Sequence, residues 1–211
     1  MKLKQITSLI SERAGRQFDV PFQKEVEQMV HYWRAEFIRR TLNKDPSGRR
    51  FFLQAYRDTL KPASKQECGG IDCNISRTES TVPSPIRTTG PLFDYVGSVN
   101  GENAFGLVHT SYIQTMKYNR YTRKHPRYMY LNGYIFVINK ADAQNIRIEG
   151  IFSDPTALAS FSCTSGSSAC YDENSEYPMP LDLAPLVINT ILTNELKLPG
   201  QEEKEVDVKE K

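Results

Sequence analysis

The chain has 211 residues, a mass of 24.1 kDa and a formal net charge of +2, and 39% of its residues are hydrophobic. This size and composition are typical of a folded protein with one good core. No run approaches the roughly 18 to 20 consecutive apolar residues of a membrane span, and residues 1–10 lack the apolar core of a signal peptide. We therefore expect no membrane association and a protein that stays in the cytosol where it is made.

Charge is spread unevenly along the chain. Residues 1–62 contain 13 Lys or Arg against 7 Asp or Glu, a net charge of +6, whereas residues 201–211 contain 5 acidic and 3 basic residues, a net charge of −2. Opposite charges in separate regions could join copies of the chain head to tail. The alternative is that they are solvated faces and a disordered tail.

The first 44 residues predict two helices. Leu3, Ile6 and Ile10 recur at helical spacing, and Gly15 can close that helix in a left-handed conformation. The second helix spans residues 22–44 and has one apolar face, with Trp33 as a core anchor. That face is made of Val26, Met29, Val30, Trp33 and Phe37, which leaves Glu27, Arg34 and Arg39 pointing outward.

Residues 45–62 predict a third helix. Asp45 followed by Pro46 is typical of an N-cap with proline at the first helical position. The inward face would be formed by Phe52, Ala55, Tyr56, Thr59 and Leu60, and Lys61 and Pro62 would end the helix.

From residue 68 to 162 the apolar pattern changes to that of strands. Residues 128–131 and 134–138 flank Asn132 and Gly133, a pair that favours the type I′ turn of a β-hairpin. Residues 146–152 predict a third strand that extends this hairpin into an antiparallel meander. Residues 92–99 and 104–111 predict a second hairpin around Asn100 and Gly101.

The C-terminal region predicts a loop, a helix and a charged tail. Residues 162–177 lack periodicity, and residues 181–198 form a helix with a narrow polar side. Its apolar residues Leu183, Leu186, Val187, Ile191 and Leu192 cover most of its circumference, so the helix must pack on several sides, within its own bundle or against a neighbouring subunit. The tail is too charged to fold alone.

These elements predict an α+β fold, in which an N-terminal helical bundle of about three helices plus a C-terminal helix accompanies an antiparallel β-sheet or small barrel. The expected divisions are a helical part (1–62), a β part (63–162), a loop (163–180), a helix (181–198) and a flexible tail (199–211).

The residues that usually carry catalysis or bind metals are not arranged for either role. His31, His109 and His125 fall in a helix, a strand and a basic loop, with no metal-binding spacing. The cysteines at 68, 73, 163 and 170 match no common zinc or disulfide pattern, so we expect free thiols. No phosphate-binding glycine motif occurs either. We predict no catalytic or metal site and no cofactor.

The clearest local feature is the basic and aromatic segment 117–128, KYNRYTRKHPRY. Its cations could neutralise phosphates while its tyrosines stack on bases. The same composition suits a protein interface, where Tyr and Arg are enriched. A solvated loop with tyrosines packed on the sheet is the third interpretation.

The order of these elements resembles the head-to-tail connector proteins, also called ring or adaptor proteins, of crAss-like and related tailed bacteriophages. The resemblance rests on residues 32–40 (YWRAEFIRR) with 42–44 (LNK), the change to strands near residue 68, and residues 91–93 (PLF) and 146–155 (IRIEGIFSDP). It covers residues 2–161 and leaves residues 162–211 unmatched.

The resemblance implies a structural virion protein of the neck or tail, made in the host bacterial cytoplasm. It implies a homo-oligomeric ring, commonly of twelve copies, that docks beneath the portal protein, contacts other neck or tail ring proteins and lets genomic DNA pass through its lumen. We expect the helix end, Arg39, Arg40, Lys44, Arg49 and Arg50, to pair with an acidic neighbour surface, and Lys117, Arg120, Tyr121, Arg123, Lys124 and Arg127 to face the portal, a tail ring or DNA. The alternative is a stand-alone nucleic-acid-binding module that uses the segment 117–128.

Overall fold

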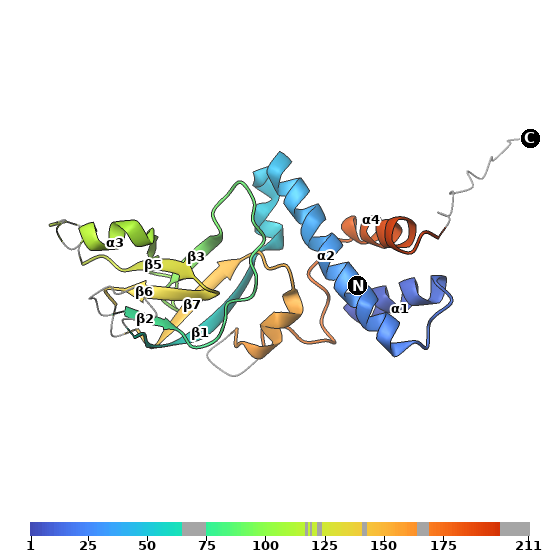
Figure 1. Cartoon of the computed structure of the whole chain (residues 1–211), viewed down its shortest axis with the longest axis horizontal. Coiled ribbons are helices and arrows are strands. Elements are labelled where there is room, and N and C mark those ends of the chain that lie inside the picture. The colour runs from blue at the N-terminus through green and yellow to red at the C-terminus, as the bar shows by residue number, and fades with distance from the viewer. Residues whose placement is uncertain are drawn as a thin grey trace, which may run out of the picture.

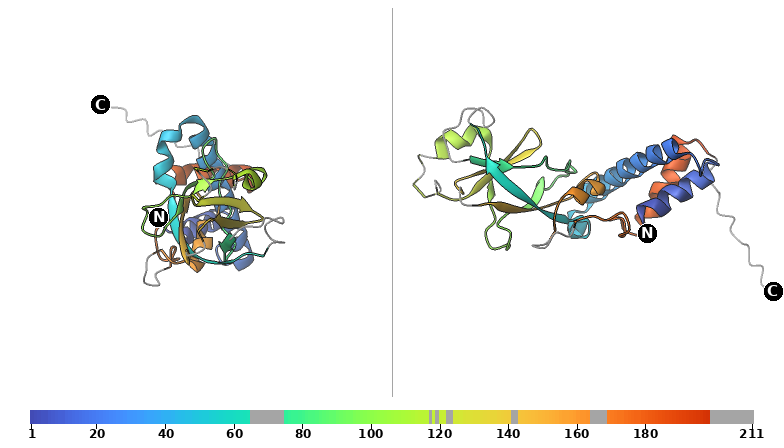
Figure 2. Two further views of the ribbon diagram at one scale, coloured as in Figure 1. Left: turned by 90° about the vertical axis from the view of Figure 1, so that its left-hand side faces the viewer. Right: turned by 90° about the horizontal axis from the view of Figure 1, so that it is seen from below.

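The N-terminal and C-terminal helices lie at one end of an elongated molecule, and the sheet lies at the other (Figure 1). The computed structural model describes residues 1–64, 75–116, 118, 120–121, 124–140, 143–163 and 169–198. A view from below shows the helices projecting from the sheet as a narrow bundle (Figure 2). The predicted α+β fold is confirmed, with helices at the N-terminus, a C-terminal helix and a nearly closed sheet.

The first two helices form where the sequence predicts them. Helix α1 spans Leu3–Arg13 and buries Leu3, Ile6 and Ile10, and Gly15 follows it with φ +69°. Helix α2 spans Val20–Lys44, and the Asp19 side chain caps it by accepting a hydrogen bond from the Phe22 N–H at 3.1 Å.

The buried face of α2 differs from the predicted one. The most buried side chains recur every four residues, namely Phe22, Val26, Val30, Arg34, Ile38 and Leu42. Four residues turn an α-helix by about 400°, so this stripe drifts about 40° around the helix at each step. The helix therefore packs against α1, against the C-terminal helix and against the turn that follows α2. Trp33 lies beside the stripe and is only partly buried.

Arg34 was predicted to point outward, and that prediction is wrong. Its side chain is buried completely, with an exposure of 0%. The sequence interpretation placed Arg34 by its charge rather than by its position, which lies four residues after Val30 and four before Ile38 on the buried stripe.

The prediction of a third helix over residues 45–62 is also wrong, because the helical segment ends at Phe52 and a strand follows it. Asp45 caps a short 3₁₀ helix, η1 (Pro46–Phe52), and strand β1 (Gln54–Pro62) follows. Tyr56, Asp58 and Leu60 alternate as the buried side chains of β1. Positions i and i+4 share one face in a helix and in a strand, so Tyr56 and Leu60 fit both patterns. Pairing with two neighbouring strands decides in favour of β1.

Seven strands form one sheet in the described residues, in the order β3-β7-β1-β2-β6-β5-β4. Their bounds are β1 Gln54–Pro62, β2 Ile75–Thr78, β3 Phe93–Gly97, β4 Gly106–Leu107, β5 Arg127–Leu131, β6 Tyr134–Ile138 and β7 Asn145–Gly150. Neighbours are antiparallel except β4 and β5, which are parallel. The two ends of the order approach each other, because Gly97 forms a bridge with Ala104 just before β4. The sheet is therefore almost a closed barrel.

The two predicted hairpins have different outcomes. Strands β5 and β6 form the predicted hairpin, with Asn132 and Gly133 at φ 51° and 80°. Strand β7 exists but does not continue it as a meander, because β2 pairs with β6 and β7 lies between β3 and β1. At the second hairpin, Gly101 takes φ 81° and the strands are short. The chain then forms helix α3 (Thr110–Met116) instead of a longer strand.

The C-terminal helix is shorter than predicted. Helix α4 spans Leu183–Thr190 and continues as a π-helical turn, Ile191–Glu195. It packs against α2 and buries Leu183, Val187, Ile191 and Leu192, while Leu186 is exposed. The interpretation that α4 packs within its own bundle therefore holds for most of its apolar face.

The expectation of free thiols is wrong for Cys163 and Cys170. These residues form a disulfide with a Cα–Cα distance of 4.8 Å. Pairing of Ser162 with Ala169 brings the two flanks together, and this proximity cannot be read from spacing alone. The bridge follows a second 3₁₀ helix, η2 (Pro155–Ser160). Cys68 and Cys73 lie outside the described residues.

One hydrophobic core joins the two ends of the molecule. It contains side chains from α1, α2 and α4 together with those of β1, β3 and β7. A second, smaller cluster lies on the opposite side of β5 and β6, where Met129, Phe136 and Ile138 pack with Ile113 of α3. Since α3 covers this cluster, it also positions the segment that follows it. Among the described helices, none has the length and apolar character needed to cross a bilayer.

Candidate interaction surfaces

The end of α2 and the helix η1 carry four exposed cations, which we call the helix-end surface: Arg39, Arg40, Lys44 and Arg50. Arg39 and Arg40 both bind Glu36, with N–O distances of 2.5 and 2.7 Å. Hydrogen bonds from Arg40 and Arg39 lower the pKa of the Glu36 carboxyl. Lys44 and Arg50 make no ion pair within the described part of the chain. The Glu36 carboxylate therefore pairs with two of the four cations, and the surface keeps a net positive charge.

Arg49 was predicted to belong to the same surface, but its guanidinium group is bound within the subunit. It donates two hydrogen bonds to the Asp94 carboxylate, at 2.7 and 2.8 Å. It also donates to the Thr88 hydroxyl and to the Pro91 carbonyl, both at 2.7 Å. These contacts fasten η1 to the segment before β3 and to Asp94 of β3 itself. Contact of Arg49 with a partner stays a prediction.

The end of η1 presents an aromatic ring to solvent. Phe51 is 84% exposed, whereas its neighbour Phe52 is buried in the core. Burial of Phe52 and the contacts of Arg49 hold this short helix at two points. Arg50 and Phe51 consequently project from a well-anchored turn.

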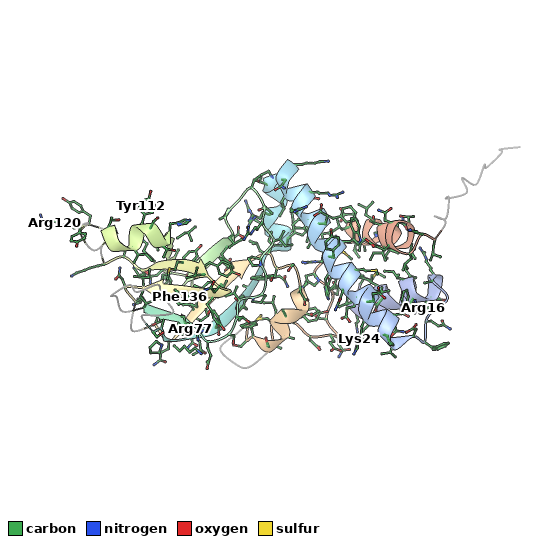
Figure 3. The ribbon with its side chains drawn as sticks, in the orientation of Figure 1. Arg16, Lys24, Arg77, Tyr112, Arg120 and Phe136 are labelled. Atoms are coloured by element: carbon green, nitrogen blue, oxygen red, sulfur yellow. A yellow bond between two sulfur atoms is a disulfide. The ribbon has the colours of Figure 1, made fainter. Side chains whose placement is uncertain are left out.

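The second predicted basic region follows α3, and we call its described residues, Tyr118, Arg120, Tyr121 and Lys124, the loop surface. All four side chains are exposed. Lys117 and Arg123, which were predicted to act with them, lie outside the described residues. Figure 3 shows Arg120 beyond α3, at the end of the molecule farthest from the helical bundle.

Arg127 was predicted to act with the loop surface but lies mostly against β4. It is half-buried, and a Cβ atom built on Gly106 would lie 3.0 Å from its Nη1 atom. Its side chain also lines a shallow hollow of about 400 Å³ with Leu107, His109 and Tyr112. The exposed Leu107 and Tyr112 give this side of the β part an apolar component.

The fold keeps the two predicted basic regions apart. The end of α2 lies near the middle of the long axis, and the segment after α3 lies at the sheet end (Figure 1). The two regions therefore cannot form one continuous binding patch on a single subunit, although both could serve different partners at once.

A groove lies along the first half of α2, and sequence reasoning did not predict it. The groove has a volume of about 620 Å³, and we call it the α1–α2 groove. It is lined by side chains of α1, α2 and η2 and by Tyr171 and Glu173. Lys4 and Glu173 form an ion pair of 2.6 Å at this groove.

Glu27 is the half-buried acid of the α1–α2 groove. Burial raises the pKa of its carboxyl, and the nearby carboxylates of Asp154 and Glu173 raise it further. Within the described residues Glu27 forms no ion pair or hydrogen bond. Lys4 and Lys24 also line the groove and lower the pKa of Glu27, but among the described residues neither forms an ion pair with it.

The buried Arg34 joins α2 to two distant segments. Its Nε donates to the Pro178 carbonyl at 2.8 Å, and its Nη1 donates to the Phe152 carbonyl at 2.9 Å. The guanidinium carbon also lies 5.5 Å from the centre of the Tyr177 ring. Arg34 therefore ties the helical end to the segment after β7 and to the segment before α4.

His31 lies beside Arg34 and has a carboxylate neighbour that the sequence did not reveal. Its Nδ1 is 2.7 Å from the Tyr177 hydroxyl, and its Nε2 is 3.6 Å from Asp154 Oδ1. Burial lowers the pKa of His31, against the opposing effect of Asp154. Within the described part of the chain, no three His, Cys, Asp or Glu side chains gather as a metal site would require.

The comparisons with known proteins agree with a structural role. A family model described as phage tail ring protein 2, from crAss-like phages, matches residues 20–211. The chain belongs to this family. The match confirms the resemblance and extends it through the C-terminal region that the resemblance left out. No curated protein matches this chain.

Membership in the family makes this chain a structural ring protein of a phage tail. A ring of identical subunits needs two different complementary surfaces on each copy, because every copy contacts one neighbour on each side. Sequence reasoning proposed one basic surface for this contact. It missed the groove and did not single out Phe51 as an exposed ring, although the predicted inward face of residues 45–62 contained Phe52, which is buried.

Proposed function

We propose that this ring protein forms a closed ring, commonly of twelve copies, in the head-to-tail connector of the phage. The ring bridges the portal protein and the tail, and genomic DNA passes through its lumen. The observation that carries this proposal is the placement of two exposed basic surfaces at separate positions on one elongated subunit, in a member of a tail ring family. One surface can then bind a neighbouring subunit while the other binds a different partner.

The helix-end surface is the better candidate for contact between subunits. It lies at the junction of the helical bundle and the sheet, where Arg39, Arg40, Lys44 and Arg50 surround the end of one long helix. Exposed cations fix orientation and register more than they add affinity, so this surface suits a partner with a matching acidic face.

The loop surface is the candidate for contact with the portal, another ring protein or DNA. Arg120 and Lys124 lie beside Tyr118 and Tyr121 at the free end of the β part. Tyrosine and arginine are, with tryptophan, enriched among the side chains that dominate the energy of protein interfaces. Positive charge at this end also suits the passage of a polyanion.

Charge reversal of the loop tests this assignment. Phage that carry Arg120→Glu, Arg123→Glu and Lys124→Glu should fail to assemble tails or to eject DNA. A matched control reverses three exposed cations of the helical end, Lys2→Glu, Arg13→Glu and Lys197→Glu, and should assemble. Normal infectious particles from the loop variant would remove the loop from the proposal.

A second candidate function is nucleic-acid binding by the separate subunit. The exposures of Tyr118 and Tyr121, 81% and 82%, beside two cations favour it, because stacking needs accessible rings. The isolated full chain would then bind DNA with an affinity that falls steeply as salt rises. A connector subunit should bind weakly or not at all under the same conditions.

Electron microscopy of phage particles distinguishes the two functions. The connector proposal expects a closed ring of this protein at the portal vertex, with density for DNA along its axis. A monomer in solution decides nothing, since ring closure can require the portal as a template. Particles that lack such a ring would contradict the connector proposal.

A further inference from the structure

Arg50 and Phe51 form a projecting pair at the end of η1. Phe51 is 84% exposed, and Arg50 makes no ion pair within the described residues. The backbone beneath them is held by the four hydrogen bonds of Arg49 and by the buried Phe52. An exposed aromatic ring beside an arginine on an anchored turn is typical of an interface anchor, because little conformational entropy is lost when it binds.

The α1–α2 groove has the opposite character. It is hollow, with a volume of about 620 Å³, and part of its lining is apolar, from Leu3, Val20 and Ala159. Among the described residues Glu27 forms no ion pair, although Lys24 lies near it in the same groove, and Lys4 is engaged with Glu173 at 2.6 Å. The groove can therefore accept an apolar side chain together with a cation from outside the subunit.

The projecting pair and the groove cannot meet on one subunit. Glu27 lies in the first half of α2, whereas η1 follows the other end of that helix (Figure 1). The 17 residues from Glu27 to Lys44 span roughly 25 Å at the rise of an α-helix. Two complementary surfaces at different places on one chain produce a head-to-tail contact, which closes into a ring when the rotation permits.

We propose that Phe51 of one subunit enters the α1–α2 groove of the next subunit, and that Arg50 pairs there with Glu27. The occupant is a second copy of this chain, because the charges and shapes of the two surfaces complement each other and each occurs on every subunit. This inference rests on the proposed ring, and it names the groove, with its carboxylate Glu27, that receives Arg50 of the helix-end surface. Cysteine cross-linking and charge exchange test it separately from the ring itself.

Cross-linking tests the position of the contact. Ser8 is an exposed residue that lines the groove, and Ser47 is an exposed residue of η1, so Ser8→Cys with Ser47→Cys places one thiol on each surface and keeps Arg50 and Phe51. Phage particles assembled with this full-length double variant should give a ladder of covalent multimers after mild oxidation. Each single variant should give no ladder. Rings that are visible in the particles without a ladder from the double variant would overturn the inference and leave the proposed function standing.

Charge exchange tests the ion pair. Arg50→Glu and Glu27→Arg should each weaken association of subunits by roughly tenfold or more, and the two changes together should restore it. Glu25→Arg and Arg13→Glu are matched controls, because both residues are exposed and neither lines the groove. Lack of restoration by the double variant, with thermal unfolding equal to that of the unchanged chain, would overturn the pairing. Absence of a ring in particles of the unchanged protein would overturn the proposed function as well.

Discussion

The helical bundle and the sheet each bury a charged side chain, and the two charges are stabilised to different degrees. Arg34 of α2 donates two hydrogen bonds to carbonyl oxygens of other segments, although its Nη2 atom has no partner. Asp58 of β1 accepts a hydrogen bond from the Thr59 N–H at 2.8 Å, and its Oδ2 atom has no partner. Burial raises the pKa of Asp58 to about 6, although backbone N–H groups of Thr59 and Ser80 oppose this effect.

The comparison of Arg34 with Asp58 shows that the effect of a buried charge on stability depends on the hydrogen bonds that it makes. Arg34 joins parts of the chain that are more than 100 residues apart, so its hydrogen bonds contribute to holding the two ends together. Asp58 accepts a hydrogen bond from the N–H of the next residue, Thr59. Its unpaired Oδ2 atom costs stability when the carboxyl is ionised. Burial disfavours the ionised form of both side chains, since it also lowers the pKa of Arg34, but only Arg34 offsets this cost with hydrogen bonds between distant segments.

Removal of Arg34 should have the largest effect. Arg34→Ala leaves the buried carbonyls of Phe152 and Pro178 unpaired and opens a cavity, so we expect a loss of about 3 to 5 kcal/mol in the free energy of unfolding. Arg34→Lys should lose less, because it keeps the charge but reaches fewer acceptors. The measurement is unfolding in urea.

Arg39→Ala is the matched control for Arg34. Arg39 is exposed and shares Glu36 with Arg40, so its removal should cost less than about 1 kcal/mol. A loss of similar size for Arg34→Ala and Arg39→Ala would contradict a joining role for the buried arginine.

Asp58 should make the protein less stable as the pH rises. Its pKa in the folded protein, about 6, lies above the ordinary value of 3.8, so the folded state binds the proton more tightly. The stabilisation is therefore complete below about pH 4 and is lost as the pH rises through about 6, by up to about 3 kcal/mol. Asp58→Asn should remove this loss and raise the free energy of unfolding at pH 7.5.

The comparison of pH 4.5 with pH 7.5 in denaturant unfolding measures the effect of Asp58. Asp182→Asn changes an exposed carboxyl and serves as the control. If Asp58→Asn lowers the free energy of unfolding at pH 7.5, the ionised carboxyl of Asp58 does not destabilise the fold as we infer.

The disulfide should contribute less than these two buried charges. Closing the short chain segment between Cys163 and Cys170 should stabilise the fold by about 2 kcal/mol through the lost entropy of the unfolded chain. Cys163→Ser with Cys170→Ser should show this loss in oxidising buffer. The difference in the free energy of unfolding between the two proteins should vanish in the presence of a reductant. If it persists there, packing of the sulfur atoms and not the disulfide bond is the source of the stabilisation.

Loss of the Tyr177 hydroxyl should have the smallest effect. Tyr177→Phe removes the 2.7 Å hydrogen bond to His31, and we expect a loss of about 1 kcal/mol at pH 7.5. Burial lowers the pKa of His31, so the folded state binds that proton less tightly, and stability should decline as the pH falls below the ordinary value of 6.5. Histidine titration by NMR would check the direction, and a pKa above 6.5 would contradict it.

Local sequence signals predicted the elements whose stability depends on neighbouring residues. The spacing of Leu3, Ile6 and Ile10 predicted α1, and Asn132 with Gly133 predicted the β5–β6 hairpin, because a helical face and a tight turn are properties of a few consecutive residues. The same reasoning found the exposed cations Lys44 and Arg50, since charge at a helix end needs no distant partner to remain at the surface.

Tertiary structure decided everything that depends on which distant segments meet. Tyr56 and Leu60 fit a helix or a strand, and pairing of β1 with β7 and β2 selects the strand. Arg34 is buried because Phe152 and Pro178 supply acceptors, and Arg49 is bound because Asp94 lies beside it. The sequence by itself determined helix ends, turns and surface charge, which are local. The sheet order, the buried charges and the groove arise from contacts over long chain separations, which no local pattern encodes.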